Sequence, residues 1–102
     1  MENNKITFKI ELPYEFRIVR YGNNDYVELE ILDKDWDMKE KKYKDTRSWK
    51  FAGYHGSVLS AIKQYIKICP VKRLEGEVKL TDVNSMYRQI QNSINSILRE
   101  VK

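Results

Sequence analysis

The chain has 102 residues, of which 41% are hydrophobic, 12% aromatic and 33% charged, a composition typical of a globular protein and not of a disordered one. No hydrophobic run reaches the roughly 20 residues that a transmembrane helix needs, and the first residues do not form a signal-peptide pattern. Cys69 is the single cysteine, so an internal disulfide is excluded. We therefore expect one soluble domain over residues 1–102, located in a reducing cytoplasm and with no membrane partner.

The net charge of +4 is concentrated in one part of the chain. Residues 34–50 contain seven basic side chains against four acidic ones, an excess of three. Such an excess attracts phosphate groups, but its small size does not by itself distinguish a nucleic acid from a protein partner.

Alternation of apolar and polar residues predicts a four-stranded, mostly antiparallel sheet over residues 5–55. The first strand covers residues 6–12, and Pro13 separates it from a second strand that starts at Tyr14. A turn at residues 22–25 leads into a third strand over 27–31, so the second and third strands form a hairpin. The fourth strand covers about 47–54. We interpret the polar segment 33–45 as a long excursion, either a loop or a protruding hairpin.

Two helices are expected after the sheet. Ser57 can cap a helix over 57–69, which Pro70 should end, because proline lacks the backbone N–H that a helix interior needs. Thr81 can cap a C-terminal helix over 81–101. The first helix has its apolar residues on one stripe: Val58, Leu59, Ile62, Tyr65, Ile66 and Cys69. The fold class is therefore α+β, a sheet followed by two helices.

The C-terminal helix has an unusually regular apolar pattern. From Val83 its apolar residues step by four and three in turn, as in a heptad repeat, and Met86 and Leu98 widen the stripe. The pattern favours two alternatives, a homodimer and packing onto the protein's own core. The candidate dimer seam is Tyr87, Ile90, Ile94, Ile97 and Val101.

The sequence does not contain the residues of a catalytic or metal site. Protein zinc sites use at least three nitrogen or sulfur ligands, whereas this chain has one histidine and one cysteine. Alternating aspartates at 33–37 resemble the start of a calcium loop, but the glycine and glutamate that such a loop needs are missing. We expect no catalytic residues, no cofactor and no metal ligands.

Cations and aromatic rings are mixed in residues 36–50, as they are in single-strand binders. The other interpretation of this segment is a solvated hairpin, since acidic residues interrupt the positive charge. The candidate partner-binding residues are Trp36, Lys39, Lys41, Lys42, Tyr43, Lys44 and Arg47.

The segment from Trp49 to Ile62, WKFAGYHGSVLSAI, resembles small phage and prophage proteins of Gram-positive bacteria. Their plan is a meander, an aromatic-rich last strand that ends in a Gly-Tyr turn, a Ser- or Thr-capped helix and a heptad-like C-terminal helix. This chain departs from the plan in its longer, more basic stretch 34–44. The resemblance implies a phage origin and the cytoplasm of a bacterial host, and it brings no established activity or functional residues.

Two functions are compatible with these features. The resemblance implies a non-enzymatic accessory protein, an inhibitor or adaptor that binds a host protein or a nucleoprotein defence complex such as a CRISPR effector. The alternative is a single-stranded nucleic-acid-binding protein that uses segment 36–50.

Overall fold

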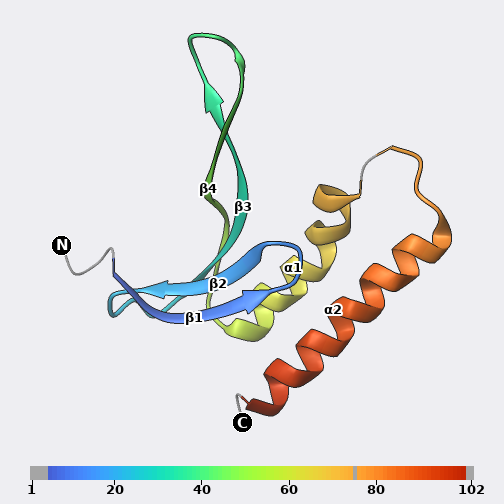
Figure 1. Cartoon of the computed structure of the whole chain (residues 1–102). Helices are drawn as coiled ribbons and strands as arrows, with labels where there is room; N and C mark the ends of the chain where they lie inside the picture. Colours follow the sequence, from blue (N-terminus) through green and yellow to red (C-terminus); the bar gives the residue numbers. More distant parts are fainter. Residues whose placement is uncertain (1–4, 75, 101–102) are drawn as a thin grey trace.

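The computed structural model describes residues 5–74 and 76–100, in which a four-stranded sheet is followed by two helices (Figure 1). The predicted α+β fold is confirmed. The strands lie in the order β1-β2-β3-β4, and all three neighbouring pairs are antiparallel. The elements are β1 (Ile6–Leu12), β2 (Phe16–Tyr21), β3 (Val27–Asp37), β4 (Lys42–His55), α1 (Val58–Arg73) and α2 (Leu80–Glu100).

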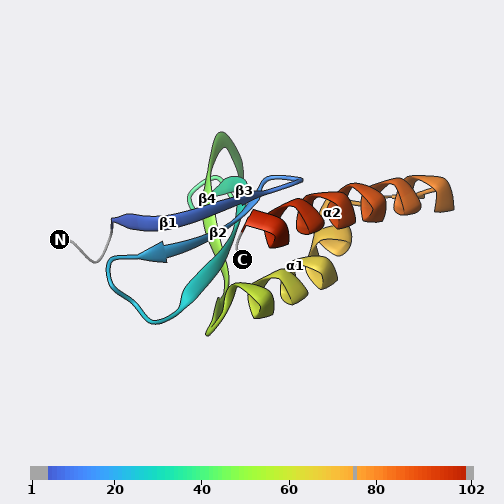
Figure 2. The ribbon, with the colours of Figure 1, turned by 90° about the horizontal axis from the view of Figure 1, so that it is seen from below.

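Both helices pack on the same face of the sheet (Figure 2). The alternation of the strands directs their apolar side chains to that face, because successive residues of a strand point to opposite sides. The core between the sheet and the helices contains Leu12, Phe16, Ile18, Val27, Leu29, Ile31, Ala61, Ile62, Tyr65, Cys69, Met86, Ile90 and Ile94. The other face of the sheet is not covered by either helix.

The excursion predicted at 33–45 is a hairpin, formed by the ends of β3 and β4, that stands away from the body of the protein (Figure 1). It projects because β2 pairs only with residues 28–31 of β3. At its tip, Asp37 Oδ1 accepts hydrogen bonds from the backbone N–H groups of Lys39 and Glu40, at 2.9 and 3.2 Å. The fourth strand therefore begins at Lys42, earlier than the predicted start at 47.

The second strand begins later than predicted, at Phe16, because Tyr14 and Glu15 form a tight turn after Pro13. Both residues have positive φ angles, of 65° and 64°. This conformation closes a hairpin with the twist that the strands need, but it is usually left to glycine or asparagine. No glycine in the sequence marks this turn.

Helix α1 continues through Pro70 to Arg73, so the predicted end at residue 69 is wrong. Pro70 is buried together with Cys69, and the Leu74 N–H still donates to the Pro70 carbonyl at 2.9 Å. Tertiary packing of this turn outweighs the helix bond that proline cannot make. Leu59 was predicted to be buried but is exposed, and Ala61 takes its place in the core.

Candidate binding surface on the third and fourth strands

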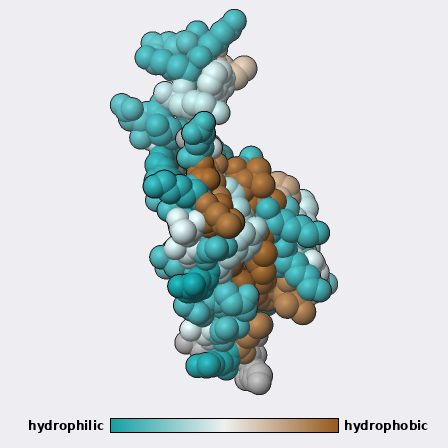
Figure 3. Space-filling view, turned by 90° about the vertical axis from the view of Figure 1, so that its right-hand side faces the viewer, coloured by the Kyte–Doolittle hydropathy of each residue, from teal (hydrophilic) through white to brown (hydrophobic). Residues whose placement is uncertain are grey.

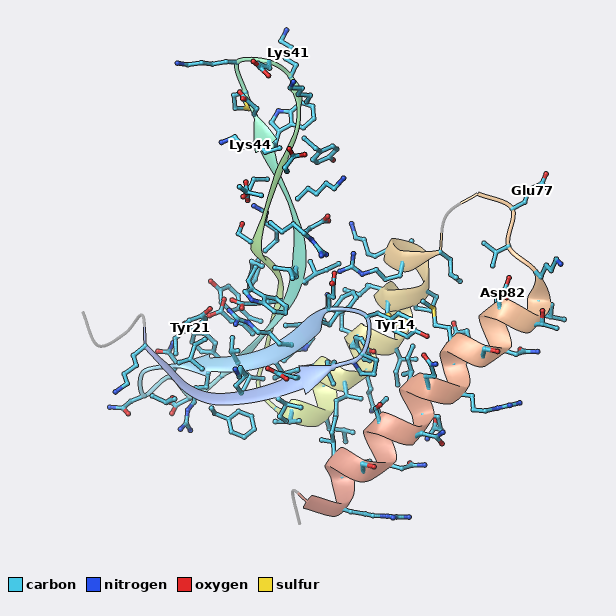
Figure 4. All side chains as sticks on the ribbon, in the orientation of Figure 1. Tyr14, Tyr21, Lys41, Lys44, Glu77 and Asp82 are labelled. Atoms are coloured by element: carbon cyan, nitrogen blue, oxygen red, sulfur yellow. The ribbon has the colours of Figure 1, made fainter. Side chains whose placement is uncertain are left out.

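All seven predicted partner-binding residues lie on the protruding hairpin and are exposed. Lys41 is at its far end and Lys44 lies nearer to the body (Figure 4). Trp36 and Tyr43 face each other across the ladder, with ring centroids 5.0 Å apart in an edge-to-face arrangement. The structure therefore brings the two predicted aromatic residues together and spreads the lysines around them.

The register of β3 and β4 extends this surface well beyond the hairpin. Residues directly opposite each other in an antiparallel ladder share a face, as do alternate residues of one strand. One face therefore carries a row of ladder pairs, which we call the ribbon face: Trp36–Tyr43, Lys34–Arg47, Leu32–Trp49, Glu30–Phe51 and Glu28–Tyr54. Every β4 residue in these pairs is aromatic or arginine.

The register of β4 is irregular at two places, and the bulge at Ala52 is the one that brings Tyr54 onto this face. One extra residue, Ala52, lies between the partners of Leu29 and Glu30, and further extra residues lie opposite Asp35. A strand without the bulge at Ala52 would alternate strictly, and Tyr54 would then point away from Phe51. Bulges of this kind re-aim side chains. The two rings instead lie with centroids 4.4 Å apart on one face.

Contacts from α1 hold the bulge at Ala52 in place. The side-chain amide of Gln64 donates to the Ala52 carbonyl at 2.9 Å. His55 bonds the same amide through Nε2 and Ser60 Oγ through Nδ1, the latter at 2.8 Å. A β-carbon at Gly53 would clash with the Gln64 amide oxygen, so glycine keeps this approach open. The histidine therefore has a structural role at the junction of sheet and helix.

Sequence reasoning placed Trp49 and Phe51 on one face and included Trp49 in segment 36–50, but it missed Phe51 and Tyr54 as members of the candidate surface. Phe51 is 54% exposed and Tyr54 is 63% exposed. The available signal was Gly53 within a strand pattern, which often marks a bulge.

The acidic side chains of the hairpin are largely occupied by its own donors. Asp35 accepts from Thr46, Ser48 and Lys50 at 2.8, 2.5 and 2.6 Å, and these bonds hold the pKa of its carboxyl well below the usual range. Glu40 pairs with Lys42 at 2.9 Å. Within residues 5–74 and 76–100, four hairpin lysines have no carboxylate within 4.0 Å: Lys34, Lys39, Lys41 and Lys44.

The ribbon face also carries two glutamates, of which Glu30 is paired with a cation. Glu30 is buried. Its carboxylate accepts hydrogen bonds from Arg17 Nε at 2.7 Å and from the Tyr21 hydroxyl at 2.6 Å. Burial and this carboxylate raise the pKa of Tyr21 to about 12. Burial also raises the pKa of Glu28. The Arg17 guanidinium lies 4.2 Å from the ring centroid of Trp49, which fixes that indole beside the exposed rings.

The candidate dimer seam on α2 is placed differently. Ile90 and Ile94 are buried in the core of the chain itself, and Ile97 packs against that core. Tyr87 is 44% exposed, and Val101 lies outside the described residues. The centre of the seam therefore serves the fold of the single chain, and self-association stays a prediction.

No protein-family model, curated protein or solved structure matches the chain. In the described part of the chain, no helix is long and apolar enough to cross a membrane. Residues 5–74 and 76–100 also contain no cluster of three or more His, Cys, Asp or Glu side chains arranged to hold a metal ion.

Proposed function

We propose that this protein is a non-enzymatic binding protein that holds single-stranded nucleic acid on the ribbon face. The observation that carries the proposal is the alignment of Tyr43, Trp49, Phe51 and Tyr54 with Arg47 on one face of β3 and β4, to which the bulge at Ala52 turns Tyr54. A sheet with helices on one side and exposed rings on the other can stack unpaired bases, since every base has a flat π-surface.

The exposed rings provide the sequence-tolerant part of such binding. Stacking of a base on an aromatic side chain is worth about 1–3 kcal/mol. Phe51 and Tyr54 form one contact area at the sheet end of the ribbon, and Trp36 and Tyr43 form another on the hairpin. A duplex has its bases stacked internally, so it offers these rings much less.

Cations provide the electrostatic part. The hairpin lysines without a carboxylate partner can follow the phosphates, while Glu30, which lies opposite Phe51, is buried and paired with Arg17. Hydrophobic side chains gather on the body of the protein, and the hairpin forms a narrow, mostly hydrophilic end (Figure 3). Rings near the sheet and cations on the hairpin thus form complementary halves of one surface.

Fluorescence anisotropy with labelled oligothymidylate and oligouridylate, and with a duplex of equal length, tests the proposal. Combined Phe51→Ala and Tyr54→Ala should weaken single-strand binding at least tenfold, because the two substitutions remove stacking interactions of about 1–3 kcal/mol each. The matched control is Tyr87→Ala, which removes an exposed ring from α2. Equal weakening by the control, or duplex binding as tight as single-strand binding, would contradict the proposal.

The salt dependence of affinity tests the hairpin separately. Lys41, Lys42 and Lys44 changed together to Glu should leave the fold intact, since all three are exposed. For each phosphate that the variant no longer neutralises, the slope of log K against log salt should flatten by about 0.7. An unchanged slope would remove the hairpin from the interface.

A protein partner is the second candidate, and one observation favours it. Met38 is 78% exposed at the hairpin tip beside Trp36, and both residue types are enriched where proteins meet. The partner would be the host protein or defence complex implied by the phage resemblance, in the host cytoplasm. For this candidate, Trp36→Ala with Met38→Ala should abolish binding to an isolated partner in buffer treated with nuclease, whereas Phe51→Ala with Tyr54→Ala should not.

A further inference from the structure

A hollow of about 490 Å³ lies between the base of the hairpin and the last turn of α1. Three of its lining residues, Lys34, Tyr43 and Arg47, belong to the ribbon face. Lys72 and Arg73 line it from α1, and Asp33 completes the lining. The hollow is therefore continuous with the surface that we propose for nucleic acid, and its walls come from two elements that are distant in sequence.

The two arginines of the hollow are held in place by the fold. Arg73 donates to the backbone carbonyls of Tyr14 at 2.8 Å and Leu32 at 2.9 Å. Arg47 also donates to the Leu32 carbonyl, at 3.2 Å, and forms a two-pronged ion pair with the carboxylate of Glu15. Guanidinium groups fixed in this way bind an anion without first losing side-chain freedom.

The two lysines are the adaptable cations of the site. Lys34 and Lys72 are exposed, and within residues 5–74 and 76–100 neither has a carboxylate within 4.0 Å. Together with the arginines they give four positive charges against Asp33 and Glu15, an excess of two. A phosphate group supplies the opposite charge and oxygen acceptors for the two lysines.

Basic residues at the end of a helix can have a simpler explanation, because they complement the negative end of the helix dipole. That explanation covers Lys72 and Arg73, which lie in the last turn of α1. It does not cover Lys34 and Arg47, which reach the same hollow from the hairpin. Convergence of cations from both sides indicates a site for an anion.

We infer that this hollow binds a backbone phosphate of the single strand, at the point where the strand passes from the sheet to the hairpin. The inference rests on the proposed function. Glu15 lies outside the lining of the hollow, but its carboxylate occupies the fork of Arg47 in the free protein. A bound phosphate would compete with it, and Tyr43 on the wall of the hollow is placed to stack the adjoining base.

Charge reversal at the two lysines tests the site. Lys34→Glu with Lys72→Glu should weaken binding of the full chain to oligothymidylate at least tenfold. The matched control is Lys63→Glu with Lys67→Glu, which makes the same charge change at exposed positions of α1 outside the hollow. Glu15→Gln should tighten binding at least twofold, because it frees Arg47 and removes a negative charge. Equal weakening by both double variants would overturn the inference, as would weaker binding by Glu15→Gln in a protein with an unchanged circular dichroism spectrum.

Inorganic pyrophosphate separates this site from the proposed function. In amide NMR spectra of the full chain it should shift the resonances of residues 33–34, 47 and 72–73, and the lysine double variant should abolish these shifts. If pyrophosphate shifts these resonances but the protein binds no oligonucleotide, the hollow is a site for a free phosphate compound and the nucleic-acid proposal is refuted. Oligonucleotide binding that depends on Phe51 and Tyr54, with no pyrophosphate shift in the hollow, would overturn the inference alone.

Discussion

Replacing Arg73 with methionine should lower the free energy of unfolding by about 3 kcal/mol, because Arg73 connects α1 to two backbone segments of the sheet. Its bonds to the Tyr14 and Leu32 carbonyls are 2.8 and 2.9 Å long. Hydrogen bonds from a charged donor contribute about 1.5–3 kcal/mol each. The side chain is only 19% exposed, but we take the lower value because a cation at the rim of a hollow keeps part of its hydration.

Methionine preserves much of the apolar stem and removes the guanidinium, which donates these hydrogen bonds and lies 5.4 Å from the ring centroid of Phe16. A decrease of about 3 kcal/mol is a large part of the 5–15 kcal/mol typical of a domain and should lower the melting temperature by at least about 10 °C. Urea denaturation followed by circular dichroism measures the free energy.

Lys72→Met is the matched control, since it removes the neighbouring exposed cation. Arg73→Lys should give an intermediate decrease, because a lysine keeps the charge but cannot present the planar fork that reaches both carbonyls. If Arg73→Met and Lys72→Met differ by less than about 0.5 kcal/mol, the scatter expected for surface changes, Arg73 does not hold the turn.

Three further changes test the core and the ion pairs. Phe16→Ala should lower the free energy of unfolding by about 3–5 kcal/mol in denaturant titrations, because Phe16 is 1% exposed and packs edge-to-face on Tyr65. A decrease below about 1 kcal/mol would contradict this packing. Tyr21 should ionise near pH 12 in absorbance titrations, and stability should fall as the pH rises between about 10 and 12, where only the unfolded tyrosine has lost its proton. Its phenolate signal should be missing in Tyr21→Phe. Hydrogen bonding to Arg47 lowers the pKa of Glu15, so this pair should stabilise the fold fully at neutral pH and lose its effect as the pH falls through the lowered pKa. Glu15→Gln should remove that part of the acid dependence.

The sheet was predictable because its signals are local. The alternation of β1 and the Gly22 turn between β2 and β3 fix the faces of these strands, and Gly22 has the positive φ, 56°, that such turns require. The helix-facing residues follow from the same alternation. The candidate surface depends on interactions between distant chain segments, and these are harder to predict because local sequence patterns indicate them only weakly.

Three features escaped prediction because tertiary contacts decide them. Pro70 argues for a helix end, yet burial of that turn and the bonds of Arg73 extend α1 by another turn. Tyr14 adopts positive φ with no glycine signal, and its carbonyl is held by Arg73. The bulge at Ala52 depends on Gln64 from α1. In each case a residue distant in sequence stabilises a local conformation that the local residues alone do not favour.

The regular apolar pattern of α2 has two explanations, and Ile94→Glu distinguishes them. A dimer seam would leave Ile94 at a surface between copies, and the substitution would then yield a folded monomer. The structure instead places Ile94 in the core of the chain, 5% exposed, in line with Met86 and Ile90 at four-residue steps. A carboxylate buried there has no partner, so we expect global unfolding at neutral pH, seen as disappearance of the circular dichroism signal. Tyr87→Glu, on the exposed flank of the same helix, should remain folded. A folded, monomeric Ile94→Glu protein obtained from a dimeric parent in sedimentation experiments would show that α2 serves an interface between copies and would refute its assignment to the core.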